Sequence, residues 1–217
     1  MSGSSKLRLL TATQLVEEQR KGSLVLDTRD PEQFAALHLR GSIQIGLLGP
    51  FASWAAILLK PTQKLAWVAE NEQSAEEARL RLARVGLERV IGYSLADETC
   101  WREEKIELAT IATLRCESVR QTLQSDPTVQ LVDVRSRAEW LKGHLPGAIS
   151  LPLLDLGSRA QLIDPSKSSL VYCREGFRAT TAASILLRES SAEIGILIDG
   201  VEGWSALGLP LEVPNTK

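Results

Sequence analysis

The stretch V-L-D-T-R-D-P-E-Q-F-A-A-L-H-L-R-G-S-I spans residues 25–43, and a similar stretch, V-D-V-R-S-R-A-E-W-L-K-G-H-L-P-G-A-I, spans residues 132–149. One offset aligns seven pairs of residues: Asp27 with Asp133, Arg29 with Arg135, Phe34 with Trp140, His38 with His144, Leu39 with Leu145, Gly41 with Gly147 and Ile43 with Ile149. The pairs include both histidines of the chain. This repeat predicts two tandem copies of one domain of about 105 residues each. The alternative is two unrelated strand–helix segments that look alike.

Short runs rich in leucine and β-branched residues alternate with helical patterns in both copies. The predicted strands are residues 23–26, 63–68, 129–132, 169–172 and 195–198. Helical spacing covers residues 74–85, where Gly86 follows as a stop signal, and residues 177–188. This alternation predicts an α/β fold with two domains, each a mainly parallel central sheet flanked by helices.

The domain boundaries follow from the repeat and from the loss of pattern between the copies. We expect a flexible tail at residues 1–6, a first domain at 7–106 and a second domain at 107–217. Residues 93–111 show no clean periodicity, and we interpret them as a connector that packs between the domains.

The composition excludes several classes of protein. The 217 residues are 44% hydrophobic and 24% charged, with a formal net charge of −2, which is typical of globular domains. Without a long basic run, a nucleic-acid-binding surface is not expected. No apolar run reaches the ~18 residues of a membrane span, and the N-terminal residues have no apolar core that would indicate a secretory signal.

The three cysteines are widely spaced and odd in number, which argues against a disulfide framework and for a reducing compartment. We therefore expect a cytoplasmic protein. A chain with no Cys-x-x-Cys and two histidines is not expected to hold a zinc site, and no other metal is predicted.

One cysteine lies where parallel α/β sheets bind their ligands. Cys173 directly follows the predicted strand 169–172 and precedes a predicted helix, so it lies at a carboxyl strand end. Backbone N–H groups of the turn and of the helix N-terminus can surround an anion there, and Gly176 allows left-handed dihedral angles. This field favours a thiolate that is open to small reagents. The alternative for a lone cysteine is a small buried hydrophobic residue.

The charged neighbours of Cys173 bear on the same prediction. Arg174 and Arg178 would stabilise a thiolate if they point inward, whereas Glu175 would oppose it and is expected to face solvent. Cys100 and Cys116 lack this context, and we interpret both as structural or incidental.

Three segments together resemble the rhodanese family of sulfurtransferases: Y-C-R-E-G-F-R-A, D-V-R-S-R-A-E-W-L-K-G-H-L-P-G-A-I-S-L-P and I-D-G-V-E-G-W, over residues 130–210. The resemblance implies an α/β fold and a cysteine that accepts a sulfane sulfur, holds it as a persulfide and passes it to a nucleophile. Cys173 would then be the catalytic sulfur carrier. A substrate-binding loop would cradle the outer sulfur or the substrate anion, formed by Arg174, Glu175, Gly176, Phe177 and Arg178.

The resemblance also implies supporting roles for three residues. Asp133 and Arg135 are expected under or beside the loop, and we interpret them as a buried ion pair that fixes its geometry rather than as chemical groups. His144 is expected to hydrogen-bond a turn; the alternative is a general base. A persulfide relay needs no strong base, because the attacking species is already a thiolate.

The length of the loop separates sulfur transfer from a competing reaction. Four residues lie between Cys173 and Arg178, whereas phosphatases that resemble this fold have five, enough to surround a tetrahedral phosphate. The shorter ring suits a single sulfur atom, so a phosphate or arsenate ester enzyme is the disfavoured alternative.

The first copy lacks these chemical groups. Alignment of Leu65 with Leu170 places Val68 opposite Cys173 and Gln73 opposite Arg178. Without a thiol there is no covalent carrier. We predict that the first copy is catalytically inactive and keeps the fold for packing, orientation or partner contact.

Residues 40–55, R-G-S-I-Q-I-G-L-L-G-P-F-A-S-W-A, resemble the first rhodanese domain of bacterial proteins that carry two such domains behind a metallo-β-lactamase-like domain. Those fusions resemble persulfide dioxygenases, so a metallo-β-lactamase-fold domain is an expected partner. The alternative is that Phe51 and Trp54 are ordinary residues of an amphipathic helix.

The function expected from these features is that of a thiosulfate or persulfide sulfurtransferase. A donor anion or thiol persulfide would load Cys173, and a thiol or cyanide acceptor would unload it, without a metal or organic cofactor. The alternative is a non-catalytic sulfur-carrier or docking module that serves a persulfide dioxygenase.

Overall fold

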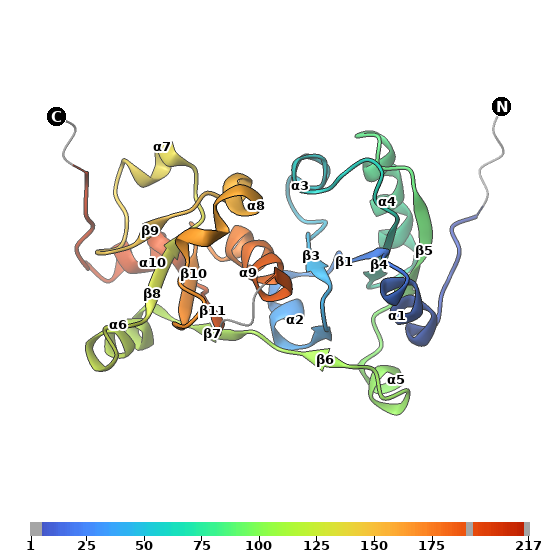
Figure 1. The fold of residues 1–217 in the computed structure, drawn as a ribbon, viewed down its shortest axis with the longest axis horizontal. Helices are drawn as coiled ribbons and strands as arrows, with labels where there is room; N and C mark the ends of the chain where they lie inside the picture. The colour runs from blue at the N-terminus through green and yellow to red at the C-terminus, as the bar shows by residue number, and fades with distance from the viewer. Residues whose placement is uncertain (1–5, 190–192, 215–217) are drawn as a thin grey trace. The chain divides into compact units, whose positions relative to one another are not determined.

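The computed structural model describes residues 6–189 and 193–214 of the chain. The chain divides into two units, Met1–Thr110 and Ile111–Lys217, and each has its own parallel sheet with helices beside it (Figure 1). This arrangement confirms the predicted α/β fold. The tail expected at residues 1–6 lies outside the described residues apart from Lys6, which forms an ion pair with Glu72.

The sheet of the first unit has the strand order β3-β1-β4-β5, and every neighbouring pair is parallel. Its strands are β1 (Leu24–Asp27), β3 (Ile43–Gln44), β4 (Leu65–Ala69) and β5 (Val90–Leu95). Strands β1 and β4 are buried along their whole length, as expected for a parallel sheet covered on both faces. The helices are α1 (Ala12–Arg20), α2 (Pro31–Ala36), α3 (Phe51–Leu58), α4 (Glu72–Ala83) and α5 (Glu98–Glu103).

Helices α1 and α5 cover one face of this sheet. Leu15 of α1 and Trp101 of α5 share a buried cluster with Val25, Ala66 and Val68 of the strands. Helix α4 packs against β4 and β5 through its own buried residues, none of which belongs to that cluster.

The segment 93–111, expected to be a connector, contains regular structure despite its weak periodicity. It contains the end of β5, all of α5, and β6 (Leu108–Ala109), which pairs antiparallel with β2 (His38–Leu39). The first unit therefore ends at Thr110, four residues later than the sequence predicts. Short polar helices with one buried face, such as the turn around Trp101, give little periodic signal.

The sheet of the second unit has the order β7-β11-β10-β8-β9, again with parallel neighbours. Its strands are β7 (Ala112–Leu114), β8 (Gln130–Asp133), β9 (Ile149–Ser150), β10 (Ser169–Tyr172) and β11 (Ile194–Leu197). Its helices are α6 (Cys116–Ser125), α7 (Arg137–Trp140), α8 (Leu156–Arg159), α9 (Phe177–Glu189) and α10 (Gly200–Ala206), with 3-10 turns at Leu153–Asp155 and Ala160–Leu162.

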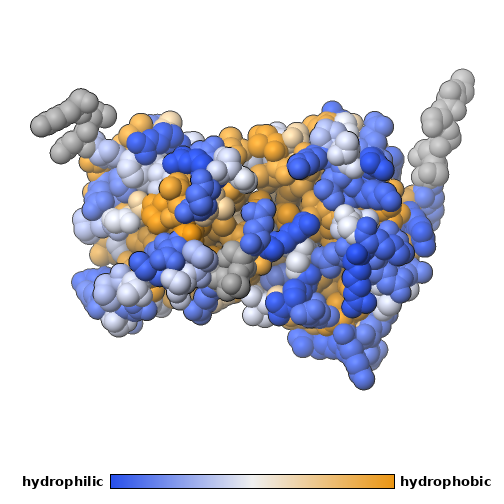
Figure 2. Space-filling model, in the orientation of Figure 1, coloured by the Kyte–Doolittle hydropathy of each residue, from blue (hydrophilic) through white to orange (hydrophobic). Residues whose placement is uncertain are grey.

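The helices of the second unit cover its sheet in the same way as those of the first unit. Cys116 and Val119 of α6 and Trp204 of α10 join one buried cluster with Leu170 and Tyr172 of β10. Helix α9 packs against β10 and β11. Where α1, α5 and α6 face the viewer in Figure 2, hydrophilic residues cover them, as expected for helices that bury one face. Within the described residues, no helix has both the length and the apolar character needed to cross a membrane.

The strand register corrects the alignment of the two copies. Asp27 of β1 pairs with Val68 of β4, and Asp133 of β8 pairs with Tyr172 of β10. Val68 is therefore the counterpart of Tyr172, and Ala69 is the counterpart of Cys173, one residue away from the position that the sequence predicted. The error arose because α4 begins three residues after Ala69, whereas α9 begins four residues after Cys173.

Candidate functional site

Cys173 lies at the carboxyl end of β10. Helix α10 donates hydrogen bonds to backbone carbonyls at the start of the loop that follows. The carbonyl of Cys173 accepts a hydrogen bond from the Val201 amide at 3.0 Å, and that of Arg174 accepts one from Glu202 at 3.4 Å. Gly200 makes this contact possible, because its φ is +57° and a Cβ there would lie 2.3 Å from the carbonyl oxygen of Arg174. The loop carbonyls are thus turned toward α10.

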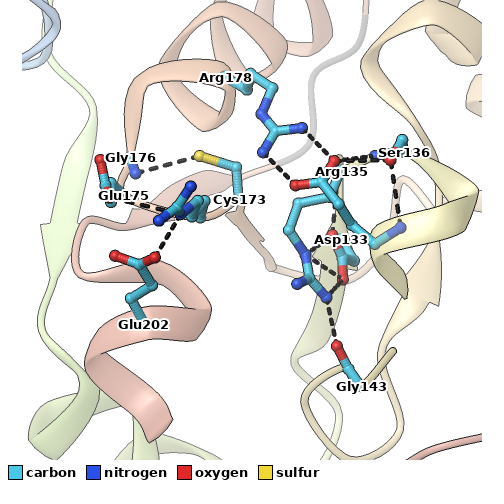
Figure 3. Close-up of polar contacts among 11 residues, drawn as sticks. Asp133, Arg135, Ser136, Gly143, Cys173, Glu175, Gly176, Arg178 and Glu202 are labelled. Atoms are coloured by element: carbon cyan, nitrogen blue, oxygen red, sulfur yellow. Dashed lines mark hydrogen bonds and ion pairs between the residues drawn. The ribbon is translucent and has the colours of Figure 1, made fainter. Parts of the chain in front are cut away.

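The sulfur of Cys173 accepts a hydrogen bond from the backbone of its own loop. The Gly176 N–H lies 3.2 Å from the Sγ atom (Figure 3). Gly176 has a φ of +93°, which confirms the predicted left-handed turn, and a Cβ there would lie 2.9 Å from the carbonyl oxygen of Ile198. Among the described residues, the amides of Glu175, Phe177 and Arg178 have no hydrogen-bond acceptor.

The expectation that this thiol is open to solvent is wrong for this structure. Cys173 is only 1% exposed. Its carbonyl is bonded to α10 and its sulfur to Gly176, so the loop folds back over the side chain.

Arg178 is the loop arginine that points inward. Its guanidinium donates to both carboxylate oxygens of Glu139 at 2.7 Å, and Figure 3 shows it between Cys173 and Ser136. The Ser136 amide and hydroxyl donate to the same carboxylate at 3.0 and 2.7 Å. These hydrogen bonds, with that from Arg178 the strongest, lower the pKa of Glu139 to about 2. The carboxylate also raises the pKa of Arg178, and the nearby Cys173 sulfur contributes to that rise.

Arg174 does not point inward. Its side chain is 62% exposed, hydrogen-bonds the Glu202 carboxylate and lies 3.6 Å from a carboxylate oxygen of Glu175. Glu175 is exposed, as the sequence predicts. Of the two arginines expected to stabilise a thiolate, only Arg178 lies on the side of the sulfur.

Asp133 and Arg135 form a buried ion pair at the end of β8, with 2.6 Å between Asp133 Oδ2 and Arg135 Nη2. The Arg135 amide also donates to Asp133 at 2.9 Å, and its guanidinium donates to the Gly143 carbonyl at 2.7 Å (Figure 3). The same guanidinium lies over the ring of Tyr172, 5.9 Å from its centroid. Every group of this pair is directed at the scaffold, which supports the structural interpretation.

His144 also contacts the scaffold. Its Nδ1 lies 3.1 Å from the Trp140 carbonyl oxygen, and its ring stacks on Trp140 with 3.7 Å between centroids. Its Nε2 lies 3.6 Å from a carboxylate oxygen of Glu212. These contacts agree with a histidine that fixes a turn rather than with a general base.

Of the other two cysteines, Cys116 is buried and Cys100 is partly buried. Burial, followed by the charge of Asp199, raises the pKa of Cys116 to about 11. The hydrogen bond to Glu104 raises the pKa of Cys100. All three cysteines are free thiols. Within the described part of the chain, no three side chains of His, Cys, Asp or Glu are grouped so that they could hold a metal ion.

The sequence analysis missed three residues that position the loop: Glu139, Gly200 and Glu202. Two signals could have found them. The spacing Ser136-x-x-Glu139 is that of a capping box, which the structure forms at α7. The glycine in D-G-V-E-G-W follows a predicted strand, where a close backbone approach often requires one.

Comparison with known proteins gives a consistent result. A family model described as a rhodanese-like domain matches residues 117–207. A protein named sulfurtransferase from Allochromatium vinosum is 33% identical over 99 residues, which cover 46% of this chain and 92% of that protein. The thiosulfate sulfurtransferase GlpE of Coxiella burnetii is 30% identical over 78 residues, 36% of this chain and 73% of GlpE.

A solved structure aligns with nearly the whole chain. It is a thiosulfate sulfurtransferase from Pseudomonas aeruginosa, 21% identical with a TM-score of 0.43. The alignment covers 97% of this chain and 44% of that protein, so the chain spans less than half of it.

Proposed function

The chain belongs to the rhodanese-like sulfurtransferase family, and we propose that its second unit transfers sulfane sulfur through a persulfide on Cys173. The observation that carries the proposal is the Gly176 N–H directed at Cys173 Sγ, at a carboxyl strand end. A donated amide hydrogen at that position stabilises negative charge on sulfur.

In the loading half-reaction, the Cys173 thiolate attacks the outer sulfur of a donor. The S–S bond of the donor breaks, and its electron pair leaves with sulfite, when the donor is thiosulfate, or with a thiolate, when it is a persulfide. The amides of Glu175, Phe177 and Arg178, which have no acceptor among the described residues, are available to the transferred sulfur. Arg178 lies on the same side and supports the added charge.

In the unloading half-reaction, an acceptor thiolate or cyanide attacks the outer sulfur of the Cys173 persulfide. The new bond forms as the S–S bond breaks, and the Cys173 thiolate is regenerated. Neither half-reaction needs a base, a metal or an organic cofactor. The cycle is therefore ping-pong, with a loaded enzyme between two substrates.

We further propose that the first unit is a second copy of the same domain without the chemistry. Its strand order β3-β1-β4-β5 corresponds to β9-β8-β10-β11, and Ala69 stands at the position of Cys173. Such a copy serves packing or partner contact, and a metallo-β-lactamase-fold domain is the partner that the sequence resemblance suggests. Three free thiols suit the reducing cytoplasm.

The decisive experiment is mass spectrometry of the chain after it is mixed with thiosulfate or with a small thiol persulfide. We expect a gain of one sulfur on the peptide that contains Cys173, and its loss when cyanide is added. Cys173→Ala should abolish the gain, and Cys116→Ala should preserve it. Absence of the added sulfur with every sulfane donor contradicts the proposal.

The alternative is a sulfur-carrier module that loads once and is unloaded only by a partner enzyme. The burial of Cys173 favours this alternative, because a covered thiol limits the approach of free acceptors. Multiple turnover with a small donor and cyanide supports the enzyme, whereas stoichiometric loading without turnover supports the carrier.

A further inference from the structure

The arginines around Cys173 are paired with carboxylates of the protein itself. Glu139 binds the Arg178 guanidinium through both carboxylate oxygens. Glu202 and Glu175 are the carboxylates beside Arg174. This cluster of two arginines and three glutamates has a formal charge of −1, so neither loop arginine is an unpaired cation for an anionic donor.

The positive field that remains is small and is already directed at the sulfur. The N-terminus of α9 carries the equivalent of about half a positive charge, and the Gly176 amide donates to Cys173. The Cys173 thiolate adds one negative charge to the cluster. The N-terminus of α9 and the Gly176 amide stabilise that charge, so little positive field is left for a donor. A donor with two negative charges would therefore approach a site that is already negative.

The loop also presents an apolar surface. Phe177 is the first residue of α9, four residues after Cys173, and it is 48% exposed. Large aromatic side chains are mostly buried in folded proteins, and an exposed one at the end of the loop that follows Cys173 offers contact area to a ligand. An inorganic anion gains no binding free energy from contact with this ring, whereas an organic group next to the reacting sulfur gains binding free energy from it.

We infer that the donor for Cys173 is an organic persulfide, R–S–SH, of low net charge and with an apolar group R, rather than the thiosulfate dianion. This inference rests on the proposed sulfur transfer. Cys173 thiolate attacks the outer sulfur, the S–S bond of the donor breaks, and its electron pair leaves as R–S⁻. The products are the Cys173 hydropersulfide and the donor thiolate, so charge and atoms balance without an added oxidant or reductant.

The test compares the rate constant for loading Cys173 from thiosulfate with that from benzyl persulfide, each followed by mass spectrometry. Glu139→Gln frees the charge of Arg178 and should raise the ratio of the thiosulfate loading rate to the benzyl persulfide loading rate by about tenfold. The variant should fold, because Gln33 completes the corresponding capping box in the first unit.

Two further variants complete the design. Asp164→Asn removes a carboxylate at the opposite end of the sheet, where Asp164 bonds Gln130 at the start of β8, and should leave both rates unchanged. Phe177→Ala should raise the KM for benzyl persulfide about fivefold and should affect thiosulfate loading much less.

Ionic strength gives an independent readout on the wild-type chain. Screening of like charges should speed thiosulfate loading when salt rises from about 0.05 M to about 0.5 M, and should not affect benzyl persulfide. Thiosulfate loading that slows with salt, or a ratio of the two loading rates that is unchanged in Glu139→Gln, overturns the inference and leaves sulfur transfer intact. No loading from either donor instead overturns the proposed function itself.

Discussion

The first and second units each contain the same kind of buried framework, but the residues at the strand ends differ between them. In each unit an aspartate at the end of one strand, β1 or β8, binds the arginine two residues later, with 2.6 Å between Asp27 and Arg29 and 2.6 Å between Asp133 and Arg135. Each arginine also donates to a carbonyl eight residues further along the chain. The framework is thus independent of the thiol.

The two histidines are equally matched. His38 Nδ1 lies 2.8 Å from the Phe34 carbonyl oxygen and its ring stacks on Phe34, as His144 does with Trp140. A histidine that is kept with the same contacts in a unit without a nucleophile is explained by turn geometry alone. The matched contacts therefore agree with a structural role for His38 and His144.

The units differ in the residues that surround the strand end. Ala69 replaces Cys173, and Gln33 occupies the position of the carboxylate that binds Arg178, namely Glu139. The carboxylate is present where the arginine is present, which indicates that the two act as a pair. Under the proposed function, the chemistry thus depends on a few loop residues above a framework that both units contain.

The largest expected effect distinguishes a residue that stabilises the fold from a residue that also supports sulfur loading. Asp133→Ala leaves Arg135 buried without its partner and should cost about 3–5 kcal/mol in the free energy of unfolding. The loop beside it should also lose sulfur loading. Asp27→Ala should cost the first unit a similar amount yet preserve loading of Cys173. Urea denaturation and mass spectrometry of the folded variants measure both quantities.

Equal loss of loading in the two aspartate variants would contradict this separation, because it would mean that the first unit supports the reaction of the second. Near-ultraviolet circular dichroism must first show that each variant is folded under the loading conditions.

The second prediction concerns the contact between α10 and the loop. Gly200→Ala places a Cβ 2.3 Å from the Arg174 carbonyl oxygen and 2.5 Å from that of Cys173 at a positive φ. We expect a loss of about 2–4 kcal/mol in stability and a loading rate reduced by at least about tenfold. Gly208→Ala is the matched control, since Gly208 has a φ of +68° with nothing within 4 Å.

Gly208→Ala should cost only about 1 kcal/mol, the strain of the backbone alone, and should leave the loading rate unchanged. Equal effects of the two substitutions would show that backbone strain, and not the approach of α10, is what matters at Gly200.

Sequence periodicity predicted strands β1, β4, β8, β10 and β11 and helices α4 and α9, because apolar runs and helical spacing are local signals, but it did not predict β5, α1 or α6. Strand β10 was predicted to the residue, and Cys173 was placed correctly at its end. The copies were misaligned by one residue, since the length of the loop after β4 depends on where α4 is capped. The accessibility of Cys173 and the partner of Arg178 depend on contacts between residues distant in sequence, which periodicity does not report.

The third prediction uses the titration of Glu139. Arg178 and Ser136 hold the pKa of this carboxyl at about 2, below its ordinary value of 4.5. Its contribution to stability is therefore fully present above about pH 4.5 and is lost as the pH falls toward 2. We expect this contribution to be about 1–2 kcal/mol, because the carboxylate is one-third exposed and solvent screens it.

Acid unfolding monitored by circular dichroism tests this prediction. Glu139→Gln and Arg178→Gln should each flatten the fall in stability of the second unit between about pH 4.5 and 2. An unchanged acid limb in both variants would show that the ion pair does not contribute to folding.

The smallest expected effect tests most directly which surroundings a strand-end thiol needs to accept sulfur. Ala69→Cys, made together with Cys173→Ala, places a thiol at the corresponding strand end of the first unit, and we expect it to gain no sulfur from any donor. The N-terminus of α4 is already capped, because the Asn71 side chain accepts from the Ser74 amide at 2.8 Å. The loop is also one residue shorter and has no glycine that matches Gly176.

A thiol at position 69 would therefore meet a helix end at which the Asn71 and Ser74 side chains already bind each other's amides, whereas the Cys173 sulfur accepts the Gly176 amide. Mass spectrometry of the peptide that contains position 69 decides the matter. Sulfur on that peptide would mean that a strand-end cysteine suffices and that the loop after β10 adds nothing. Its absence assigns the reactivity of Cys173 to the free amides of its loop.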